Sequence, residues 1–391
     1  MNEHILKICY AENARLPTEK AHGYQIMKTC EALAKQGLDV TLVHADRKNP
    51  LAGKDPFEHY GVEKTFKISK LPVWDILTDA PSFLWSFAFV IGRWSFTRSL
   101  KRWMKSRIEC DVLYTRDPVV AQAFVESGTK KPIFLELHDS PLSNQGRWNR
   151  VKDKISGFIV ITKGLKDLLI SQGIPEEKIC LSMDAFDPGE FVGLPDKAEA
   201  RRRLKLDDGK IVFVYTGHLF PWKGIDSIAS GFDKIPEGSE FVIVGGNLED
   251  LERVKKLVPS GAKNVRFTGR MPHAEALLWL AAADAAVLPT SAKFEIGRLY
   301  TSPIKLFEYL AAGLPVIASD VPSAHEVLDE SMGIFFSPDD AGSFADALGK
   351  FVGYPDEVKK GISEACRKCS GSFTWEKRGE MISAFIKSNI R

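Results

Sequence analysis

Residues 302–320 read SPIKLFEYLAAGLPVIASD, and this stretch joins a helix to a buried strand. Ser302 is a favourable N-cap and Pro303 suits the first helical position, so the sequence predicts that a helix begins here. Gly313 and Pro315 end that helix, and the apolar run VIAS that follows is typical of a strand buried on both faces. A helix followed at once by a buried strand is the repeating element of a parallel α/β sheet.

The same alternation of short apolar runs and amphipathic segments extends along the whole chain. In the second half the runs are IVFVYTG (211–217), EFVIVGG (240–246), NVRFTG (264–269) and AAVLP (285–289). In the first half they are ILKICY (5–10), DVTLVHA (39–45), DVLYT (111–115), IFLELHD (133–139) and GFIVIT (157–162), with helical patterns at 22–36 and 163–173. Each run is short and ends near Gly, Pro or Asp, so the sequence predicts two consecutive doubly wound α/β domains.

The length of 391 residues exceeds what one hydrophobic core usually supports. Pro and Gly cluster in FDPGEFVGLPD (186–196), which places the predicted seam there. We therefore expect an N-terminal domain over 1–190 and a C-terminal domain over 191–373. The ending 374–391 reads as one amphipathic helix, with Thr374 as its cap, that could pack on either domain.

The composition excludes several classes of protein. Hydrophobic residues make up 44% and charged residues 27%, as in ordinary globular proteins, and a net charge of +2 gives no pull toward nucleic acid. Six cysteines are few for this length and the start lacks the pattern of a secretory signal, so a cytoplasmic location is expected. Cys366 and Cys369 form a C-x-x-C pair without a second pair at metal-ligand spacing, and no metal site is predicted.

One stretch, residues 81–107, is rich in Phe and Trp and then in Arg and Lys, with no acidic residue. Its apolar core FLWSFAFVIG is about half the length that spans a bilayer, where about 20 residues are needed. Two interpretations stay open. The stretch suits a peripheral helix on anionic lipid at the inner face of the membrane, or an internal helix with a solvated basic side.

Two segments of the second half carry groups suited to a diphosphate. The helix that begins near Ser302 and Pro303 directs free N–H groups and its positive dipole end outward, and Lys305 adds a charge in its first turn. Glu308 lies further along the same side, where a carboxylate can accept hydrogen bonds from a ribose diol, although a solvated helix charge is an equal alternative. In YTGHLFPWKGID (215–226), His218 and Lys223 are further donors.

The position of YTGHLFPWKGID in the chain supports the interpretation that this segment binds a diphosphate. The segment follows a buried-type strand, and open α/β sheets bind ligands at the carboxyl ends of their strands. Gly217 there lets the backbone approach a ligand closely. The alternative is a loop with incidental basic residues.

The first half offers weaker signals. The loop ARLPTEKAHGYQ (14–25) lacks the G-x-G-x-x-G pattern of dinucleotide binding but places polar groups at a strand-to-helix junction. ELHDSP (136–141) puts His138 just past a strand end. An isolated histidine is more often structural, but this one sits where two domains would face each other.

Taken together, these segments resemble the family 4 glycosyltransferases of the GT-B fold. The resemblance covers most of the chain and is most specific in YTGHLFPWKGID, SPIKLFEYLAAGLPVIASD, NVRFTGRMPHAEA (264–276) and AAVLPTS (285–291). It is looser in TEKAHG, TRDP (115–118), ELHD and SMDAFDPGEF (182–191). It implies a GT-B architecture, in which two doubly wound Rossmann-like domains face each other across a cleft.

The resemblance also implies roles for particular residues. Glu308 would hold the nucleotide ribose, and His218 and Lys223 the diphosphate, with Gly217, Ser302, Pro303 and Lys305 around it. Arg270 and Met271 would lie along the base. Gly23 would let the N-terminal loop approach the donor phosphate, and His138 would sit near the transferred sugar, so that His138, Lys223 and His218 are the expected catalytic residues.

The family's E-x7-E pattern would place a first glutamate at position 300, where this chain has Tyr300. Glu295 is the only substitute that we can suggest, from a different loop position. The identity of the sugar therefore stays open at this point.

The implied activity is retaining transfer of a hexose-type sugar from a nucleoside diphosphate sugar to a glycan or lipid-linked acceptor, without a metal or any cofactor beyond the donor. Stabilising the departing phosphate is the main electrostatic task of such a reaction. Two rivals share the architecture, a nucleotide-sugar epimerase and a non-catalytic nucleotide-sugar binding module. A dinucleotide-dependent oxidoreductase would require the missing glycine pattern.

Overall fold

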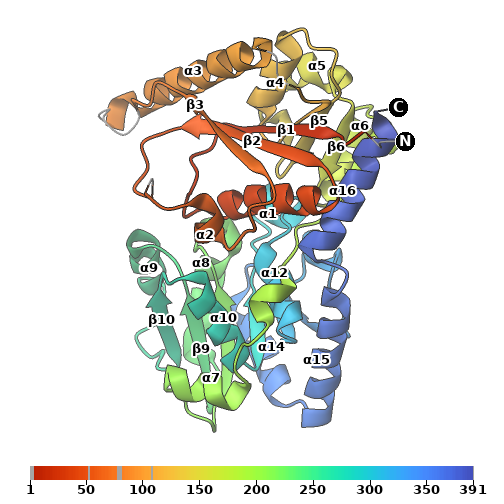
Figure 1. The fold of residues 1–391 in the computed structure, drawn as a ribbon. Coiled ribbons are helices and arrows are strands. Elements are labelled where there is room, and N and C mark those ends of the chain that lie inside the picture. The colour runs from red at the N-terminus through yellow and green to blue at the C-terminus, as the bar shows by residue number, and fades with distance from the viewer. Residues whose placement is uncertain (1–3, 52, 77–81, 107–108, 391) are drawn as a thin grey trace. The chain divides into compact units, whose positions relative to one another are not determined.

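The computed structural model describes residues 4–51, 53–76, 82–106 and 109–390. The chain divides into two compact units. Unit 1 comprises residues 1–161, 165–183 and 375–391, and unit 2 comprises 162–164 and 184–374. Each unit is a parallel sheet with helices on both faces, so the expected α/β class with two doubly wound Rossmann-like domains is confirmed (Figure 1).

Unit 1 contains a seven-stranded sheet in the order β3-β2-β1-β4-β5-β6-β7, and every neighbouring pair in it is parallel. Its strands are β1 (Lys7–Glu12), β2 (Asp39–Asp46), β3 (Lys67–Pro72), β4 (Val112–Thr115), β5 (Ile133–Leu137), β6 (Gly157–Val160) and β7 (Ile179–Leu181). The strand order reverses between β1 and β4, which is where open α/β sheets form a crevice at their carboxyl edge.

Helices cover both faces of this sheet (Figure 1). They are α1 (Ala21–Lys35), α2 (Pro56–Tyr60), α3 (Trp85–Lys105), α4 (Pro118–Glu126), α5 (Gln145–Val151), α6 (Lys163–Ser171) and α16 (Trp375–Asn389). The last helix returns from the far end of the sequence and packs along α1, burying Ile382 and Ile386 in the same apolar cluster as Ile26. Helix α16 thus completes the core of unit 1.

Unit 2 contains a six-stranded parallel sheet in the order β10-β9-β8-β11-β12-β13. Its strands are β8 (Ile211–Thr216), β9 (Ser239–Val244), β10 (Val265–Gly269), β11 (Ala285–Leu288), β12 (Val316–Ser319) and β13 (Gly333–Phe336). Most residues of β8, β9, β11 and β12 are buried, as expected for strands covered on both faces. Here the order reverses between β8 and β11.

The sheet of unit 2 separates two apolar clusters, one on each face, and the helices of the unit complete these clusters. The helices are α7 (Lys197–Leu204), α8 (Ile225–Ile228), α9 (Leu248–Lys255), α10 (His273–Ala282), α11 (Glu295–Leu299), α12 (Ile304–Ala311), α13 (Pro322–His325), α14 (Ala341–Val352) and α15 (Asp356–Ser370). Within the described ranges of both units, none of the helices combines the length and apolar character needed to cross a membrane.

The structure adds three strands that the apolar pattern did not predict, β3, β7 and β13. β3 and β13 are edge strands with alternating or exposed positions, and β7 is an edge strand of three residues. Edge strands need fewer apolar side chains because one side is not covered by another strand. Their weak sequence signal follows from this position.

Candidate functional site

The loop that follows β8 begins at the point of unit 2 where the strand order reverses. Gly217 has a φ of 114° and its N–H donates to the carbonyl of Val244, at the end of β9, over 2.8 Å. Gly245, with a φ of 117°, packs so closely that a Cβ there would lie 2.3 Å from the carbonyl oxygen of Gly217. Close packing requires glycine at position 245 and the positive φ favours it at 217, at the carboxyl edge where open α/β sheets bind ligands.

Lys223 is held at the end of this loop by a tight contact with the neighbouring strand. Gly224 has a φ of 81°, and a Cβ there would lie 1.6 Å from the carbonyl oxygen of Pro289, which follows β11. This places Lys223 over the reversal point between β8 and β11. Burial lowers the pKa of Lys223 to about 8, and the nearby carboxylate of Asp184 opposes only part of this effect.

Lys305, in the first turn of α12, is directed back toward the same loop. Its Nζ lies 3.6 Å from the place that a Cβ of Gly217 would occupy and 3.5 Å from the centroid of the Tyr215 ring. That nitrogen is buried and donates no hydrogen bond to any described residue. Burial and then the charge of Lys223 hold the pKa of Lys305 well below its ordinary value. A buried lysine amino group without a hydrogen-bond partner, close to a second lysine, forms a site that favours an anion.

His218 lies on the same side of the loop and is half-buried. Its pKa is lowered by burial and then by the charges of Arg270 and Lys305, so the neutral imidazole predominates at neutral pH. The ring stacks on Phe220 with 5.0 Å between centroids. The structure therefore brings His218, Lys223, Lys305 and Arg270 into one electropositive region. We expected His218, Lys223 and Lys305 around a diphosphate and Arg270 along the base, so the position of Arg270 in this region differs from the expectation.

Met271 directly follows Arg270 and packs against the apolar cluster on one face of the sheet. Its side chain is thereby used in the core. Any contact of this position with a base would come from the backbone, as the resemblance implies.

Glu308 is buried rather than solvated, so the alternative of a solvated helix charge is wrong. Its Oε1 lies 3.5 Å from Nε2 of His273, and the same Nε2 lies 3.1 Å from Oε2 of Glu190. Burial raises the pKa of Glu308, and the charge of His273 offsets part of this rise. A buried carboxylate next to a histidine is suited to accept hydrogen bonds from hydroxyl groups.

Glu190, His273 and Glu308 offer ligand atoms within 4.8 Å of one another. Among the described residues this is the group with the spacing and chemistry to hold a cation. Nε2 of His273 is hydrogen-bonded to Oε2 of Glu190 over 3.1 Å and lies 3.5 Å from Oε1 of Glu308, so the members of this group already contact one another.

Ser302 does not cap α12, and this expectation is wrong. The helix begins at Ile304, and Pro303 is the N-cap rather than the first helical residue, with extended angles of φ −78° and ψ 125°. The hydroxyl oxygen of Ser302 instead accepts a hydrogen bond of 3.1 Å from the backbone N–H of Asp184. The start of α12 has no side-chain cap, so its first N–H groups keep their capacity to bind an anion.

Gly23 of unit 1 lies in the first turn of α1 rather than in the preceding loop. A Cβ there would lie 2.2 Å from the hydroxyl of Tyr60 and 2.6 Å from Cγ2 of Thr18. The Tyr60 hydroxyl donates to the carbonyl of Thr18 and accepts from its N–H, over 2.8 and 2.6 Å. Within unit 1, the need for glycine at this position comes from the packing of Tyr60.

His138 follows β5 and is held by a buried carboxylate. Its Nε2 lies 2.5 Å from Oε1 of Glu136, which also accepts a 2.8 Å hydrogen bond from Nη2 of Arg378 on α16. The hydroxyl of Tyr114 donates to the other oxygen. Burial alone would raise the pKa of Glu136, but Arg378 and His138 outweigh it and hold this pKa well below its ordinary value. The imidazole is therefore oriented through its Nε2 atom.

Tyr300 occupies the position where the family pattern has a glutamate. Its hydroxyl donates to Oε1 of Glu295, at the start of α11, over 3.2 Å. Tyr300, at the family's glutamate position, is thus hydrogen-bonded to Glu295, the substitute that we suggested for that glutamate.

Several residues of the site carried no clear signal in the sequence. Tyr215 reads as an ordinary strand residue, and its contact with Lys305 depends on tertiary structure. His273 and Glu190 lie in quoted segments but 83 positions apart, and a pair of that separation is not detectable from spacing. Gly245 had a usable signal, because a Gly-Gly pair directly after a buried strand indicates close backbone approach.

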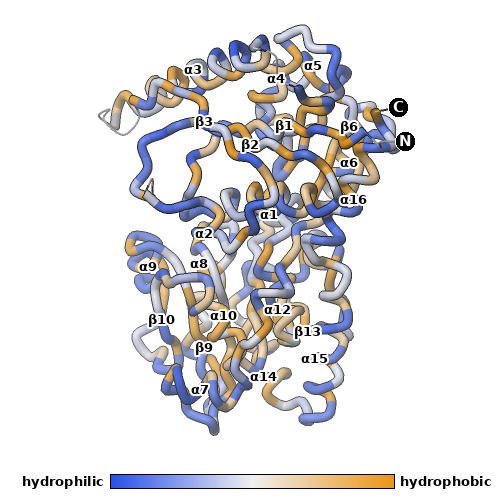
Figure 2. Tube along the Cα trace, viewed as in Figure 1, coloured by the Kyte–Doolittle hydropathy of each residue, from blue (hydrophilic) through white to orange (hydrophobic). Residues whose placement is uncertain are grey.

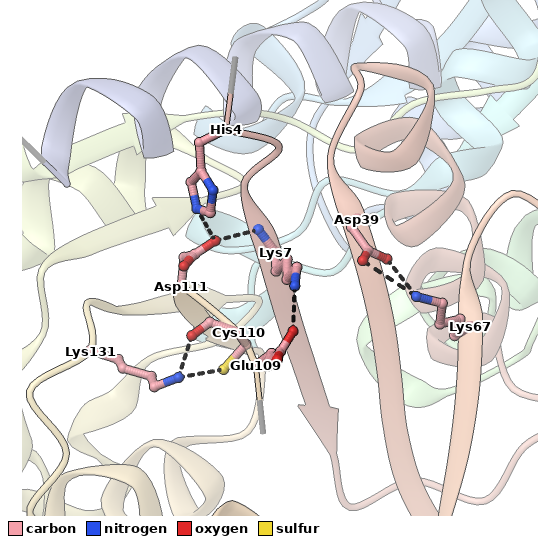
Figure 3. Close-up of polar contacts among 8 residues, drawn as sticks. All are labelled: His4, Lys7, Asp39, Lys67, Glu109, Cys110, Asp111 and Lys131. Atoms are coloured by element: carbon pink, nitrogen blue, oxygen red, sulfur yellow. Dashed lines mark hydrogen bonds and ion pairs between the residues drawn. The ribbon is translucent and has the colours of Figure 1, made fainter. Parts of the chain in front are cut away.

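Polar contacts join the amino ends of the strands in the unit 1 sheet, at the edge opposite the carboxyl ends (Figure 3). Lys7 begins β1, and its N–H and Nζ bind Asp111 and Glu109 over 2.8 and 2.7 Å. Lys67, at the start of β3, bonds Asp39, at the start of β2, over 3.1 Å. These partly exposed ion pairs join the amino ends of neighbouring strands and leave ligand binding to the carboxyl edge.

Comparison with known proteins places this geometry in a family. Residues 23–181 match the model described as Glycosyltransferase Family 4, and residues 210–353 match that described as Glycosyl transferases group 1. The matched stretches include most of both sheets. The chain belongs to the family 4 glycosyltransferases of the GT-B fold.

Individual relatives are distant. The chain is 24% identical over 202 residues to the GDP-mannose-dependent monoacylated alpha-(1-6)-phosphatidylinositol monomannoside mannosyltransferase of Corynebacterium glutamicum, a match that covers 50% of this chain and 52% of that protein. The chain spans between half and three fifths of the length of the first curated relatives that it matches.

Two solved structures share the fold over nearly the whole chain. Sucrose-phosphate synthase from Thermosynechococcus elongatus superimposes with a TM-score of 0.77 at 18% identity, covering 98% of both chains. Anabaena Alr3699/HepE in complex with UDP and glucose gives a TM-score of 0.73 at 16% identity, covering 98% of this chain and 100% of the other.

Proposed function

We propose that this glycosyltransferase moves a hexose from a nucleoside diphosphate sugar to a glycan or lipid-linked acceptor, with retention of anomeric configuration. The observation that carries the proposal is the buried amino group of Lys305 at the carboxyl edge of β8, which lies near Lys223 and has no hydrogen-bond partner among the described residues. A diphosphate supplies such a partner, and Alr3699/HepE, which shares the fold, is described in complex with UDP and glucose.

The remaining donor contacts follow from the same arrangement. His218 donates a hydrogen bond to the diphosphate, and the uncapped start of α12 contributes its N–H groups. Glu308 accepts hydrogen bonds from the ribose hydroxyls. The backbone of Arg270 and Met271 lies along the base.

The reaction that we propose breaks the bond between the anomeric carbon and the distal phosphate oxygen. The acceptor oxygen forms its bond on the same face of the sugar, and its proton passes to the departing phosphate. Lys223, Lys305 and His218 stabilise the negative charge that develops on that phosphate. His138 of unit 1 takes part in transfer rather than in nucleotide binding.

We also propose that transfer needs no metal. Lys223 and Lys305 would supply positive charge to the diphosphate, and the polar atoms of Glu190, His273 and Glu308 already contact one another. Activity in excess EDTA should equal activity in excess Mg²⁺. Loss of activity in EDTA that Mg²⁺ restores would disprove this part of the proposal.

For the acceptor we propose a class, a glycan or a lipid-linked sugar, rather than a single compound. The Corynebacterium glutamicum relative acts on a phosphatidylinositol monomannoside, as its name states, which keeps a lipid-linked acceptor under consideration. We place the enzyme in the cytoplasm, where nucleotide sugars are made available to it.

The test begins with thermal-shift measurements on a panel of nucleoside diphosphates and their sugars, because a ligand that binds the folded state raises the midpoint. The best donor is then incubated with and without candidate acceptors, and the product's anomeric configuration is determined by NMR. Transfer with retention supports the proposal. Isomerised donor without acceptor would establish an epimerase, and binding without transfer or hydrolysis would establish a binding module.

A further inference from the structure

Helix α3 is anchored to unit 1 by one side only. The buried side contains Ala88, Gly92, Ser95, Phe96 and Leu100. The hydroxyl of Ser95 accepts a 2.9 Å hydrogen bond from the N–H of Trp74, and that of Ser99 donates over 2.7 Å to the carbonyl of Pro72, so the helix is fixed beside β3. The opposite side of the helix faces away from the sheet (Figure 1).

That opposite side begins with large apolar residues. Phe87, Val90 and Trp94 recur at helical spacing and expose 63%, 60% and 48% of their surface. Other exposed aromatic residues flank them, namely Trp74, Phe83 and Trp85. An apolar surface of this extent on a protein marks an interaction site rather than ordinary solvent exposure.

The same side continues into basic residues toward the end of the helix. Arg98, Arg102 and Lys105 are exposed and follow the row of Phe87, Val90 and Trp94. The guanidinium of Arg98 lies 5.4 Å from the centroid of the Trp94 ring, which joins the apolar and basic parts. Figure 2 shows this change along α3, from orange and white near its beginning to mostly blue toward its end. We name these six residues of α3 the aromatic-basic face.

The charge of this face is not neutralised within the helix. The sequence from Trp85 to Lys105 has no acidic residue. Among the basic residues of α3, Lys101 forms an ion pair with a described neighbour. Its Nζ lies 2.7 Å from Oε2 of Glu126 in α4. The partner of this face must therefore accept both aromatic side chains and positive charge, which is the chemistry of an anionic lipid surface.

Other occupants fit less well. A second copy of the chain would present the same basic residues and no compensating acid from its own α3. A purely internal role for α3 does not account for the exposed row of Phe87, Val90 and Trp94. Pro81 and Arg107, the two ends of the aromatic and basic stretch 81–107, lie outside the described residues.

We propose that the aromatic-basic face of α3 docks unit 1 on the surface of an anionic bilayer, with the aromatic side chains in the interfacial region and the basic ones at the lipid headgroups. This inference does not depend on the proposed transfer reaction. It concerns a peripheral contact, since a helix with these exposed basic residues lies along the interface rather than across it.

Co-sedimentation of the full chain with vesicles tests the proposal. The chain should bind vesicles of phosphatidylcholine mixed with phosphatidylglycerol far better than vesicles of phosphatidylcholine alone. Binding should weaken strongly at about 1 M salt, where the Debye length falls to about 3 Å. Equal binding to both vesicles, or none to either, would overturn the proposal.

Two pairs of variants and their matched controls localise the contact. Arg102→Glu with Lys105→Glu should reduce binding at least about 30-fold, since each basic residue at an anionic surface contributes roughly fivefold. Lys256→Glu with Lys263→Glu, exposed in unit 2, makes the same change in net charge and should leave binding nearly unchanged.

Phe87→Ser with Val90→Ser should also reduce binding, whereas Leu257→Ser with Val358→Ser, exposed in unit 2, should not. Equal losses in test and control pairs would refute docking through α3. Sedimentation velocity distinguishes the remaining alternative. A dimer that dissociates in the Phe87→Ser, Val90→Ser variant, together with absent vesicle binding, would show that a second copy covers this face and would overturn the proposal.

Discussion

The Nζ of Lys305 lies 3.5 Å from the centroid of the Tyr215 ring, a buried strand residue of β8. The negative face of the ring partly stabilises the ammonium group, but it does not replace a hydrogen-bonded anion. The pKa of Lys305 is held well below its ordinary value by burial and by Lys223. The free protein thus holds a buried amino group without a hydrogen-bond partner next to the backbone of Gly217.

This relationship predicts opposite effects of Lys305→Met on stability and on binding. Removing a buried group without a hydrogen-bonded partner should leave the midpoint of thermal unfolding unchanged or higher. The affinity for the nucleoside diphosphate should fall roughly 10- to 100-fold, because a charge-assisted hydrogen bond is lost. Calorimetry and thermal shift measure the two effects, with the exposed Lys263→Met as control. A lower midpoint with unchanged affinity would contradict the proposed role.

Diphosphate binding should depend on pH through Lys223. Its pKa in the free protein is about 8, so the charged form is depleted as pH rises through that value. A bound diphosphate favours the charged form and raises this pKa, so binding near pH 8 takes up protons and affinity falls at higher pH. Titration calorimetry in buffers with different ionisation enthalpies measures the uptake. In Lys223→Met the uptake should shrink, and an affinity that rises with pH would exclude this mechanism.

The ribose contact of Glu308 can be isolated by changing the ligand as well as the protein. The wild-type protein should bind a nucleoside diphosphate roughly 10- to 100-fold more tightly than its 2′,3′-dideoxy analogue, since hydrogen bonds to a charged group are lost. For Glu308→Ala this ratio should approach one, while the exposed Glu330→Ala keeps the wild-type ratio. If Glu308→Ala still discriminates fully, another residue holds the ribose.

His138→Ala should separate transfer from nucleotide binding. The Glu136 carboxylate keeps Arg378 and Tyr114 as partners in this variant, so the fold should persist. We expect kcat to fall at least about 100-fold, as is common when a positioned imidazole is removed, with the Kd of the nucleoside diphosphate unchanged. Steady-state kinetics and calorimetry together check this. Wild-type turnover would leave His138 a structural residue.

The pairing of Glu136 with Arg378 predicts a large loss of stability in Arg378→Met. The change leaves a buried carboxylate without its main opposite charge, which costs about 3–5 kcal/mol. For a unit of this size that lowers the melting midpoint by about 10 °C. Differential scanning calorimetry should assign the loss to one transition, and Lys387→Met, an exposed change on the same helix, should show little. Equal midpoints for the two variants would argue against the ion pair.

The apolar central strands could be predicted from sequence because burial on both faces imposes a continuous apolar run, as in VFVYT before Gly217. The edge strands could not, since KISKLP of β3 is mostly polar or exposed. In the candidate site, too, only the features with a local sequence signal could be predicted. The glycine and lysine positions carried a local signal, whereas the approach of His273 to Glu190 and Glu308 depends on three separate segments folding together.

Ser302 shows why a strong local signal can fail. Serine followed by proline favours a helix start by local energetics alone. Here the hydroxyl has a tertiary partner, the backbone N–H of Asp184, and the helix begins two residues later at Ile304. A tertiary hydrogen bond that satisfies a backbone donor has taken the place of the local cap.

The return of the chain to unit 1 through α16 makes unit 2 a topological insertion. Its two ends lie side by side, where the N–H of Phe186 donates to the carbonyl of Phe373 over 3.0 Å. Residues 184–374 should therefore be obtainable as an autonomous polypeptide, suited to measuring nucleotide affinity in isolation. Unit 1 has no such continuous equivalent, and its recombinant form would require a short linker that splices Met183 to Trp375.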